Sequence, residues 1–153
     1  MHSTHTSEPL FIEGGLAVDD RGSITFANDF DFAQVKRFYM VENVSTEVVR
    51  AYHGHAKEAK YALIASGSAI VVAVAMDDTR APSKENKVHR YVLSSKKPGV
   101  LYIPAGFVNG FRALEPQTRI LFFSTSTLEE SKGDDFRFPT DYWGSELWNV
   151  ENR

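Results

Sequence analysis

The sequence predicts an all-β domain built as a sandwich or a barrel. Short apolar runs that are typical of strands follow one another at regular spacing, and turn-forming residues separate them. No segment of useful length shows the apolar repeat of an amphipathic helix. The chain of 153 residues has the length of one domain, and its 42% of apolar residues is ordinary for a soluble globular protein.

The first third of the chain is expected to start with a polar segment and to continue with two strands. Residues 1–8 are the expected disordered N-terminus, so the domain spans residues 9–153. Residues 10–18 form a predicted edge strand, which ends at the turn signal of residues 19–23. Residues 34–43 are rich in aromatic and β-branched side chains and predict the next strand.

The centre of the chain is expected to hold a strand with two histidines and then a core hairpin. If the segment around His53 and His55 is extended, both imidazoles project from one face, whereas Arg50 falls on the other face. Residues 62–76 contain two apolar runs around the turn Ser66-Gly67-Ser68, which predicts the hairpin.

The last part of the chain is expected to add short strands, one helical turn and a packed tail. Residues 77–87 are charged and predict a loop, and strands are expected at residues 88–93, 100–103 and 118–125. Residues 128–132 have the composition of a single helical turn. The tail after them carries five aromatic residues, so we expect it to pack on the domain.

The composition excludes several classes of protein and of site. The absence of cysteine excludes disulfides, thiolate catalysis and cysteine-ligated zinc. A net charge of -3 argues against a nucleic-acid binder held by phosphate attraction. The longest apolar run, residues 69–76, is too short to span a membrane, and the N-terminus lacks the features of a signal peptide. The expected location is the cytoplasm.

The two histidines are the residues best suited to chemistry. Two imidazoles on one face bind a metal ion, transfer protons near neutral pH, or form hydrogen bonds within the core. Arg50 and Lys60 lie close to His53 and His55 in the sequence, which places cationic groups near the pair. These residues alone leave the three interpretations open.

The spacing of these residues resembles the two motifs of the cupin jelly roll, a double-stranded β-helix. The matching positions are His53, His55, Gly67, Gly99, Pro104 and Gly106. Metal-binding cupins have a glutamate where this chain has Lys60 and a histidine where it has Asn109. Two of the four metal ligands are therefore missing, and one is replaced by a cation. The resemblance implies a cupin fold without a metal ion.

The chain is also similar to the metal-independent cupins related to dTDP-4-dehydrorhamnose 3,5-epimerase. The segments that carry this similarity are Asp20-Arg21-Gly22, Arg50-Ala51-Tyr52-His53, Lys60 and residues 101–111. In contrast, His55 and the segment Lys36-Arg37-Phe38-Tyr39 resemble the sugar 3,4-ketoisomerases. Phe122 stands where the 3,5-epimerases have a tyrosine that donates a proton. The choice between epimerisation and 3,4-keto isomerisation stays open.

The resemblance implies a cytoplasmic isomerase of deoxysugar and cell-surface polysaccharide biosynthesis that uses no cofactor. Its substrate would be a keto-deoxysugar joined to a nucleotide diphosphate, with dTDP as the expected nucleotide. The implied catalytic residues are His53, His55, Lys60 and Tyr39, and the implied substrate-binding residues are Arg21, Arg50 and Asn109. Two alternatives remain: a non-catalytic cupin that binds a sugar or nucleotide, and a metal-dependent cupin.

Each implied catalytic role has a chemical reason. A base that takes a proton from the carbon next to a ketone works best with a pKa near neutrality, which favours His53. Its second ring nitrogen would be held by Asp135 or Asp141, and Lys60 would stabilise the oxyanion that forms. In this family the arginine equivalent to Arg21 tends to reach into the neighbouring subunit, which implies a homodimer.

Overall fold

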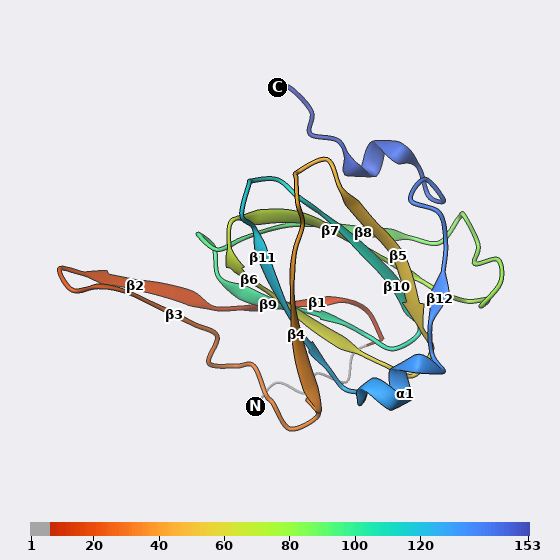
Figure 1. The fold of residues 1–153 in the computed structure, drawn as a ribbon, viewed down its shortest axis with the longest axis horizontal. Helices are drawn as coiled ribbons and strands as arrows, with labels where there is room; N and C mark the ends of the chain where they lie inside the picture. Colours follow the sequence, from red (N-terminus) through yellow and green to blue (C-terminus); the bar gives the residue numbers. More distant parts are fainter. Residues whose placement is uncertain (1–6) are drawn as a thin grey trace.

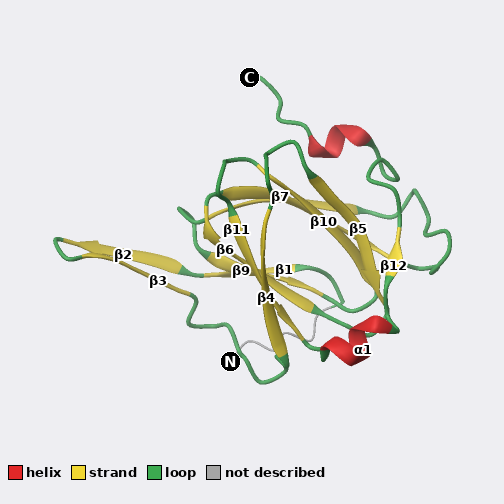
Figure 2. Cartoon of the chain, viewed as in Figure 1, coloured by secondary structure: helices red, strands yellow, loops and turns green. Residues whose placement is uncertain are grey.

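The computed structural model describes residues 7–153, which form two five-stranded antiparallel sheets and a separate two-stranded ribbon (Figure 1). The expected disordered N-terminus at residues 1–8 therefore lies mostly outside the described residues. Helical structure in the described chain is confined to two short segments, α1 (Leu128–Lys132) and the 3-10 turn η1 (Ser145–Trp148) (Figure 2). The predicted all-β class is confirmed, and no helix among residues 7–153 is long and apolar enough to cross a membrane.

The first sheet has the strand order β1-β9-β6-β11-β4. Its strands are β1 (Leu10–Glu13), β9 (Gly99–Ile103), β6 (Lys60–Ser66), β11 (Arg119–Ser124) and β4 (Arg37–Glu42). The second sheet has the order β12-β5-β10-β7-β8. Its strands are β12 (Phe136–Arg137), β5 (Val49–His55), β10 (Phe107–Ala113), β7 (Ser68–Ala75) and β8 (Val88–Ser94). Successive strands thus alternate between sheets along much of the chain, as in a jelly roll.

The main core lies between the inner faces of the two sheets. Strands β6, β9 and β11 contribute side chains from one sheet, and β7, β8 and β10 contribute them from the other. The fully buried members include Ala62, Val71, Leu101 and Ile120. Burial of such side chains stabilises the fold by about 1.5–3 kcal/mol for each large aliphatic residue.

The predicted hairpin at residues 62–76 is wrong. The turn at Ser66-Gly67-Ser68 is present, but β6 pairs with β9 and β11, whereas β7 pairs with β8 and β10. The turn therefore carries the chain from one sheet to the other. Gly67 has a φ of +81°, and a Cβ at this position would lie 2.2 Å from the hydroxyl oxygen of Thr118, so the corner requires glycine.

Two other expectations about strands need correction. The edge strand predicted at residues 10–18 is divided at Gly14 into β1 and β2 (Gly15–Asp19), because the chain leaves the sheet there. Strands β3 (Gly22–Phe26), β10 and the two-residue β12 were not predicted at all. The other predicted strands and the helical turn at residues 128–132, which begins with a capping box of Thr127 and Glu130, agree with the structure.

Strands β2 and β3 form a ribbon that projects away from the body of the domain (Figure 1). The tip of this ribbon is the predicted turn at residues 19–23. Apolar side chains lie on its surface, and Val18 and Ile24 are 71% and 66% exposed. An apolar ribbon of this kind is a typical site of protein–protein contact.

The aromatic tail packs on the domain, as predicted, and the structure places it on the outer face of the second sheet. Phe138, Trp143 and Trp148 are buried in a cluster with Tyr52 of β5 and with valines of β7. The tail also supplies β12, whose two residues pair with Gly54 and His53 of β5. Through this pairing the end of the chain becomes one wall of a cavity between the sheets.

Candidate active site

A cavity of about 230 Å³ opens between the two sheets and gathers residues from six strands and the segment before β12. Its lining comprises Tyr39, Val41, Arg50, His53, His55, Lys60, Asn109, Phe111, Phe122, Asp135 and Arg137. Six of the seven residues predicted from the sequence are therefore brought together. A larger groove of about 580 Å³ at the loops after β4 and β10 carries no histidine, lysine or arginine, so it offers no comparable chemistry.

His53 lies in the middle of the cavity wall formed by the second sheet. It pairs with Asn109 of β10 on one side and with Arg137 of β12 on the other. Burial lowers the pKa of His53, and the positive charges of Lys60 and Arg137 lower it further, whereas Asp135 acts in the opposite direction. The imidazole is therefore neutral at pH 7 and able to accept a proton.

His55 is held by groups behind the cavity. Its Nδ1 lies at hydrogen-bond distance from the backbone carbonyl of Asp134 and 3.2 Å from Oε2 of Glu58. Both neighbours are acceptors when the carboxylate is ionised, so Nδ1 carries the proton in the neutral ring. The Nε2 atom is buried and has no hydrogen-bond partner among residues 7–153. Burial is the main cause that lowers the pKa of His55, and Lys60 adds to it.

Lys60 enters the cavity from β6 of the first sheet and is only 8% exposed. Its Nζ lies 5.6 Å from the ring centre of Tyr39 and 5.8 Å from that of Phe122. The nearest carboxylate oxygen is Oε2 of Glu58, at 4.0 Å. A buried ammonium beside two stacked aromatic rings is a fixed positive charge, which suits the stabilisation of an oxyanion.

Tyr39 and Phe122 are direct neighbours across β4 and β11. Their rings stack with a centroid distance of 5.2 Å and an interplanar angle of 21°. Phe122 occupies the position that the resemblance to the 3,5-epimerases assigns to a tyrosine. On this side of the cavity the phenolic hydroxyl therefore belongs to Tyr39 on β4, the strand next to the one that carries Phe122.

Arg50 reaches the cavity because β5 is irregular. Between Asn109 and Phe111 the register shifts, so that two residues of β5, Ala51 and Tyr52, lie opposite the single residue Gly110 of β10. Such a bulge moves the next side chain to the other face, which explains why Arg50 and His53 line the same cavity although a regular strand would separate them. The Nε of Arg50 donates a hydrogen bond of 2.6 Å to Oδ1 of Asn43.

Arg21 is the one predicted site residue that lies elsewhere. It is at the tip of the projecting ribbon, where its guanidinium is exposed and pairs with the carboxylate of Asp19. It does not line the cavity of its own chain.

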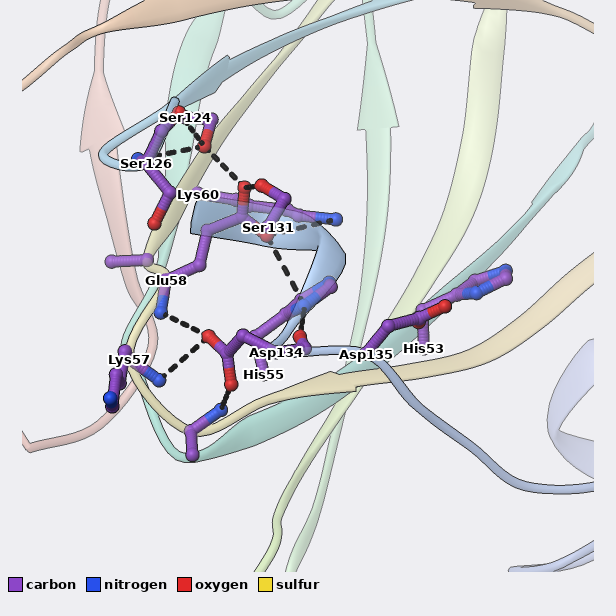
Figure 3. Close-up of polar contacts among 12 residues, drawn as sticks. His53, His55, Lys57, Glu58, Lys60, Ser124, Ser126, Ser131, Asp134 and Asp135 are labelled. Atoms are coloured by element: carbon purple, nitrogen blue, oxygen red, sulfur yellow. Dashed lines mark hydrogen bonds and ion pairs between the residues drawn. The ribbon is translucent and has the colours of Figure 1, made fainter. Parts of the chain in front are cut away.

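Sequence reasoning missed several polar residues around the cavity or behind it. Asp134 accepts three backbone hydrogen bonds from the loop at residues 56–58, with N–O distances of 2.7–3.0 Å (Figure 3). Glu58 lies in that loop, and Arg137 lines the cavity and pairs with Asp135 at 3.1 Å. Of the two carboxylates predicted to hold His53, only Asp135 lines the cavity, so the alternative of Asp141 is not supported.

The donor set is a poor match for a divalent cation. Within residues 7–153, no group of three or more His, Cys, Asp or Glu side chains is arranged to hold a metal ion. The ammonium of Lys60 is near enough to both imidazoles to lower their pKa values. The same positive charge would repel a bound cation.

The lowered pKa values predict that the protein loses stability in mild acid. The pKa values of His53 and His55 lie below 6.5 in the folded state and near 6.5 in the unfolded state. As the pH falls, the unfolded chain therefore binds these protons before the folded chain does. We expect the free energy of unfolding to fall as the pH drops from about 6.5 through the folded pKa values. Urea denaturation at several pH values measures this slope. In a His53→Gln/His55→Gln variant the slope should be shallower, and an equal slope would contradict the prediction.

Comparison with known proteins gives one family for this chain. Residues 4–139 match the family model described as dTDP-4-dehydrorhamnose 3,5-epimerase. The spore coat polysaccharide biosynthesis protein SpsL of Bacillus subtilis is 31% identical over 112 residues, which cover 69% of this chain and 70% of SpsL.

Solved structures share the fold. NovW, a 4-keto-6-deoxy sugar epimerase of Streptomyces spheroides, has a TM-score of 0.74 at 17% identity, covering 94% of this chain and 75% of that one. The RmlC epimerase of Mycobacterium tuberculosis has a TM-score of 0.72 at 17% identity, covering 97% and 76%. The sugar 3,4-ketoisomerase QdtA of Thermoanaerobacterium thermosaccharolyticum has a TM-score of 0.65 at 20% identity, covering 90% and 93%. These likenesses confirm the predicted cupin-type jelly roll.

Proposed function

Because this chain belongs to the family of dTDP-4-dehydrorhamnose 3,5-epimerase, we propose that it isomerises a nucleotide-linked keto-deoxysugar by moving a proton next to the ketone. The observation that carries this proposal is the cavity in which a neutral His53 faces a buried Lys60. A neutral base and a fixed positive charge in one enclosed site are what proton abstraction beside a carbonyl requires.

The proposed reaction uses the two walls of the cavity in different roles. His53 takes the proton from the carbon next to the ketone, and Asp135 stabilises the imidazolium that forms. Lys60 stabilises the negative charge that develops on the ketone oxygen. Tyr39 on the opposite sheet, or His55 beside the base, returns a proton to the enolate. Return to the same carbon from the other side gives an epimer. Return to the former carbonyl carbon, with transfer of the hydroxyl proton of the first carbon to the former ketone oxygen, gives a 3,4-keto isomer with the new ketone on the first carbon.

The proposed substrate carries a thymidine diphosphate. The QdtA structure is a complex with TDP, and an epimerase structure from Legionella pneumophila is a complex with dTDP-4-keto-L-rhamnose. In this chain Arg50 and Arg137 line the cavity and present guanidinium groups that suit the two phosphates. Asn109 adds an amide donor close to His53.

Deuterium exchange tests the proposed function directly. The protein is incubated in D₂O with dTDP-4-keto-6-deoxyglucose, and the sugar protons are followed by NMR. We expect loss of the C3 proton signal, and the product spectrum then separates an epimer from a 3,4-keto isomer. Absence of exchange at C3 and C5 with dTDP-linked and other nucleotide-linked keto sugars would overturn the proposal.

One observation favours a second candidate, a non-catalytic nucleotide-sugar binder. Phe122 is buried in the cavity wall and cannot donate a proton from the position of the epimerase tyrosine. This candidate predicts that dTDP raises the unfolding temperature while no sugar proton exchanges. Exchange catalysed by the wild type, and lost without Tyr39, would reject it.

We further propose that two chains exchange their ribbons and form a homodimer. The ribbon of β2 and β3 exposes Val18 and Ile24, and the outer face of β4 exposes Phe38 (68%) and Met40 (50%). Burial of these side chains against a second copy would remove them from water. The same arrangement would carry Arg21 from the tip of the ribbon to the partner's cavity.

Mixing two inactive variants tests the ribbon exchange. If the active site combines His53 of one chain with Arg21 of the other, refolding an equal mixture of Arg21→Ala and His53→Ala chains should recover about a quarter of the wild-type activity. A mixture of His53→Ala and Lys60→Met chains is the control, because both residues come from one chain and no intact site can form. A monomer in light scattering, or equal recovery in both mixtures, would contradict the exchange.

A further inference from the structure

Glu58 is a buried carboxylate that none of the catalytic roles above uses. It lies in the loop between β5 and β6, behind the cavity wall, and its side chain is only 1% exposed. A carboxylate at such a place is costly to bury unless its charge is compensated, so each of its oxygens must have a partner or a task. Figure 3 shows Glu58 between the serines of one side and the imidazole of His55 on the other.

The first oxygen, Oε1, holds the carboxylate in place. The hydroxyl of Ser124 donates a hydrogen bond to it, and the hydroxyl of Ser131 donates another at 2.9 Å. The guanidinium of Arg37 adds a third contact at 3.2 Å. These three donors come from β11, α1 and β4, so the position of Glu58 is set by rigid elements.

The second oxygen, Oε2, points toward the active site. It lies 3.2 Å from Nδ1 of His55 and 4.0 Å from Nζ of Lys60. It is buried and has no hydrogen bond of ordinary geometry within residues 7–153. Binding of Arg37 involves only Oε1, so it does not account for the position of Oε2 beside an imidazole and an ammonium.

We propose that Glu58 is a positioning residue, which acts with the backbone carbonyl of Asp134 to keep the proton of His55 on Nδ1 and so leaves the buried Nε2 of this ring unprotonated in the cavity wall. This inference rests on the proposed function, and it assigns His55 as a second, carboxylate-supported acid or base beside His53. Glu58 also provides the fixed negative charge next to Lys60. The site thus holds two imidazoles, each with a carboxylate near it: Asp135 for His53 and Glu58 for His55.

The charged and titratable groups around His55 come from two strands and two loops. Lys60 on β6 lowers the pKa of His55, and His53 on β5 lies in the same cavity wall. Glu58 and Asp134, from the loops before β6 and before β12, raise the pKa of His55. A neutral group in place of Glu58 would leave Lys60 as the dominant charge. The pKa of His55 should then fall further.

The first test needs no substrate and no variant. In ¹⁵N-labelled wild-type protein, long-range proton–nitrogen NMR spectra report which ring nitrogen of each histidine is protonated. We expect His55 to be the Nδ1–H tautomer at pH 8, with Nε2 unprotonated. An Nε2–H tautomer would overturn the proposal even if every Glu58 variant failed to fold.

The second test compares Glu58→Gln with Ser131→Ala. The glutamine keeps an oxygen for the serines and Arg37 but turns an NH₂ group toward His55, so the titration of His55 should move to lower pH by about one unit. Ser131→Ala removes one hydrogen bond of the same carboxylate and keeps its charge, so His55 should titrate as in the wild type. In Glu58→Asp, which keeps the negative charge on a shorter side chain, His55 should titrate between its values in the wild type and in Glu58→Gln.

Kinetics then separates a positioning role from a structural one. In Glu58→Gln we expect kcat to fall about tenfold with little change in KM, and the acid limb of kcat/KM to move with the titration of His55. An equal loss in Ser131→Ala at equal unfolding temperature, or an unchanged titration of His55, would overturn the proposal. Failure of the wild type to turn over any keto sugar would instead reject the proposed function, while the titration of His55 in Glu58→Gln, which needs no substrate, would still decide the role of Glu58.

Discussion

Replacing His53 with alanine is expected to slow deuterium exchange into the keto sugar by about a hundredfold to ten-thousandfold, the range typical for loss of a general base. The imidazole lines the cavity and forms no hydrogen bond to another described residue, so its removal leaves the fold intact. We therefore expect the unfolding temperature and the affinity for dTDP to change little. Exchange rates from NMR and the melting curve together check this prediction.

His89→Ala is the matched control for this experiment. His89 is also a partly buried strand histidine whose pKa is lowered mainly by burial, but it lies on β8 outside the cavity. Its loss should leave the exchange rate unchanged. If His53→Ala retained wild-type exchange, the role of the base would pass to His55.

Replacing Asp134 with alanine should have the largest effect on stability, about 3 kcal/mol. Its buried carboxylate is the acceptor for the backbone N–H groups of Ala56, Lys57 and Glu58, and each donor left without an acceptor costs about 1–3 kcal/mol. The sum is reduced because water can reach part of the loop. For a domain of this size the unfolding temperature should fall by about 9 °C. Urea denaturation measures the change.

Asp78→Ala provides the matched control. Asp78 also accepts two backbone hydrogen bonds, from Arg80 and Ala81, but it lies in an exposed loop where water replaces it. We expect its loss to cost less than about 1 kcal/mol. Equal destabilisation by the two variants would show that burial of the Asp134 carboxylate is not the cause. Asp134→Ala should also reduce activity, because the loop that holds Glu58 is no longer fixed.

The strands with strong apolar character were predictable because their signal is local. Strand β10 was missed because Asn109 and Gly110 interrupt its apolar run, and both are needed there: Asn109 lines the cavity, and a Cβ at position 110 would lie 2.3 Å from that of Ala51. The false hairpin at residues 62–76 has the opposite origin. A glycine turn between apolar runs is a local signal, but β6 pairs with β9 and β11 and β7 pairs with β8 and β10, so the two strands do not pair across the turn.

Much of the site was also accessible from the sequence, since His53, His55, Lys60 and their neighbours follow one another within a short segment. The residues that support them were less accessible: Asp135 was predicted only as an alternative to Asp141, and Asp134, Glu58 and Arg137 were not predicted. Asp134 and Asp135 reach the site only because a two-residue strand near the C-terminus pairs with β5, and no periodicity announces a pairing across about 80 positions. Glu58 could not be distinguished in the sequence from an exposed charged loop residue, because Ser124 and Ser131, which bind it, are distant in the sequence.

The short strand β12 also makes the order of synthesis matter. Until residues 134–137 have left the ribosome, β5 keeps an open edge beside His53, and the loop before β6 lacks its anchor. A nascent chain can therefore complete most of its barrel and still have an unfinished pocket. The proposed proton transfer would become possible only when translation has passed this point, so prematurely terminated copies would share the fold but lack the complete cavity.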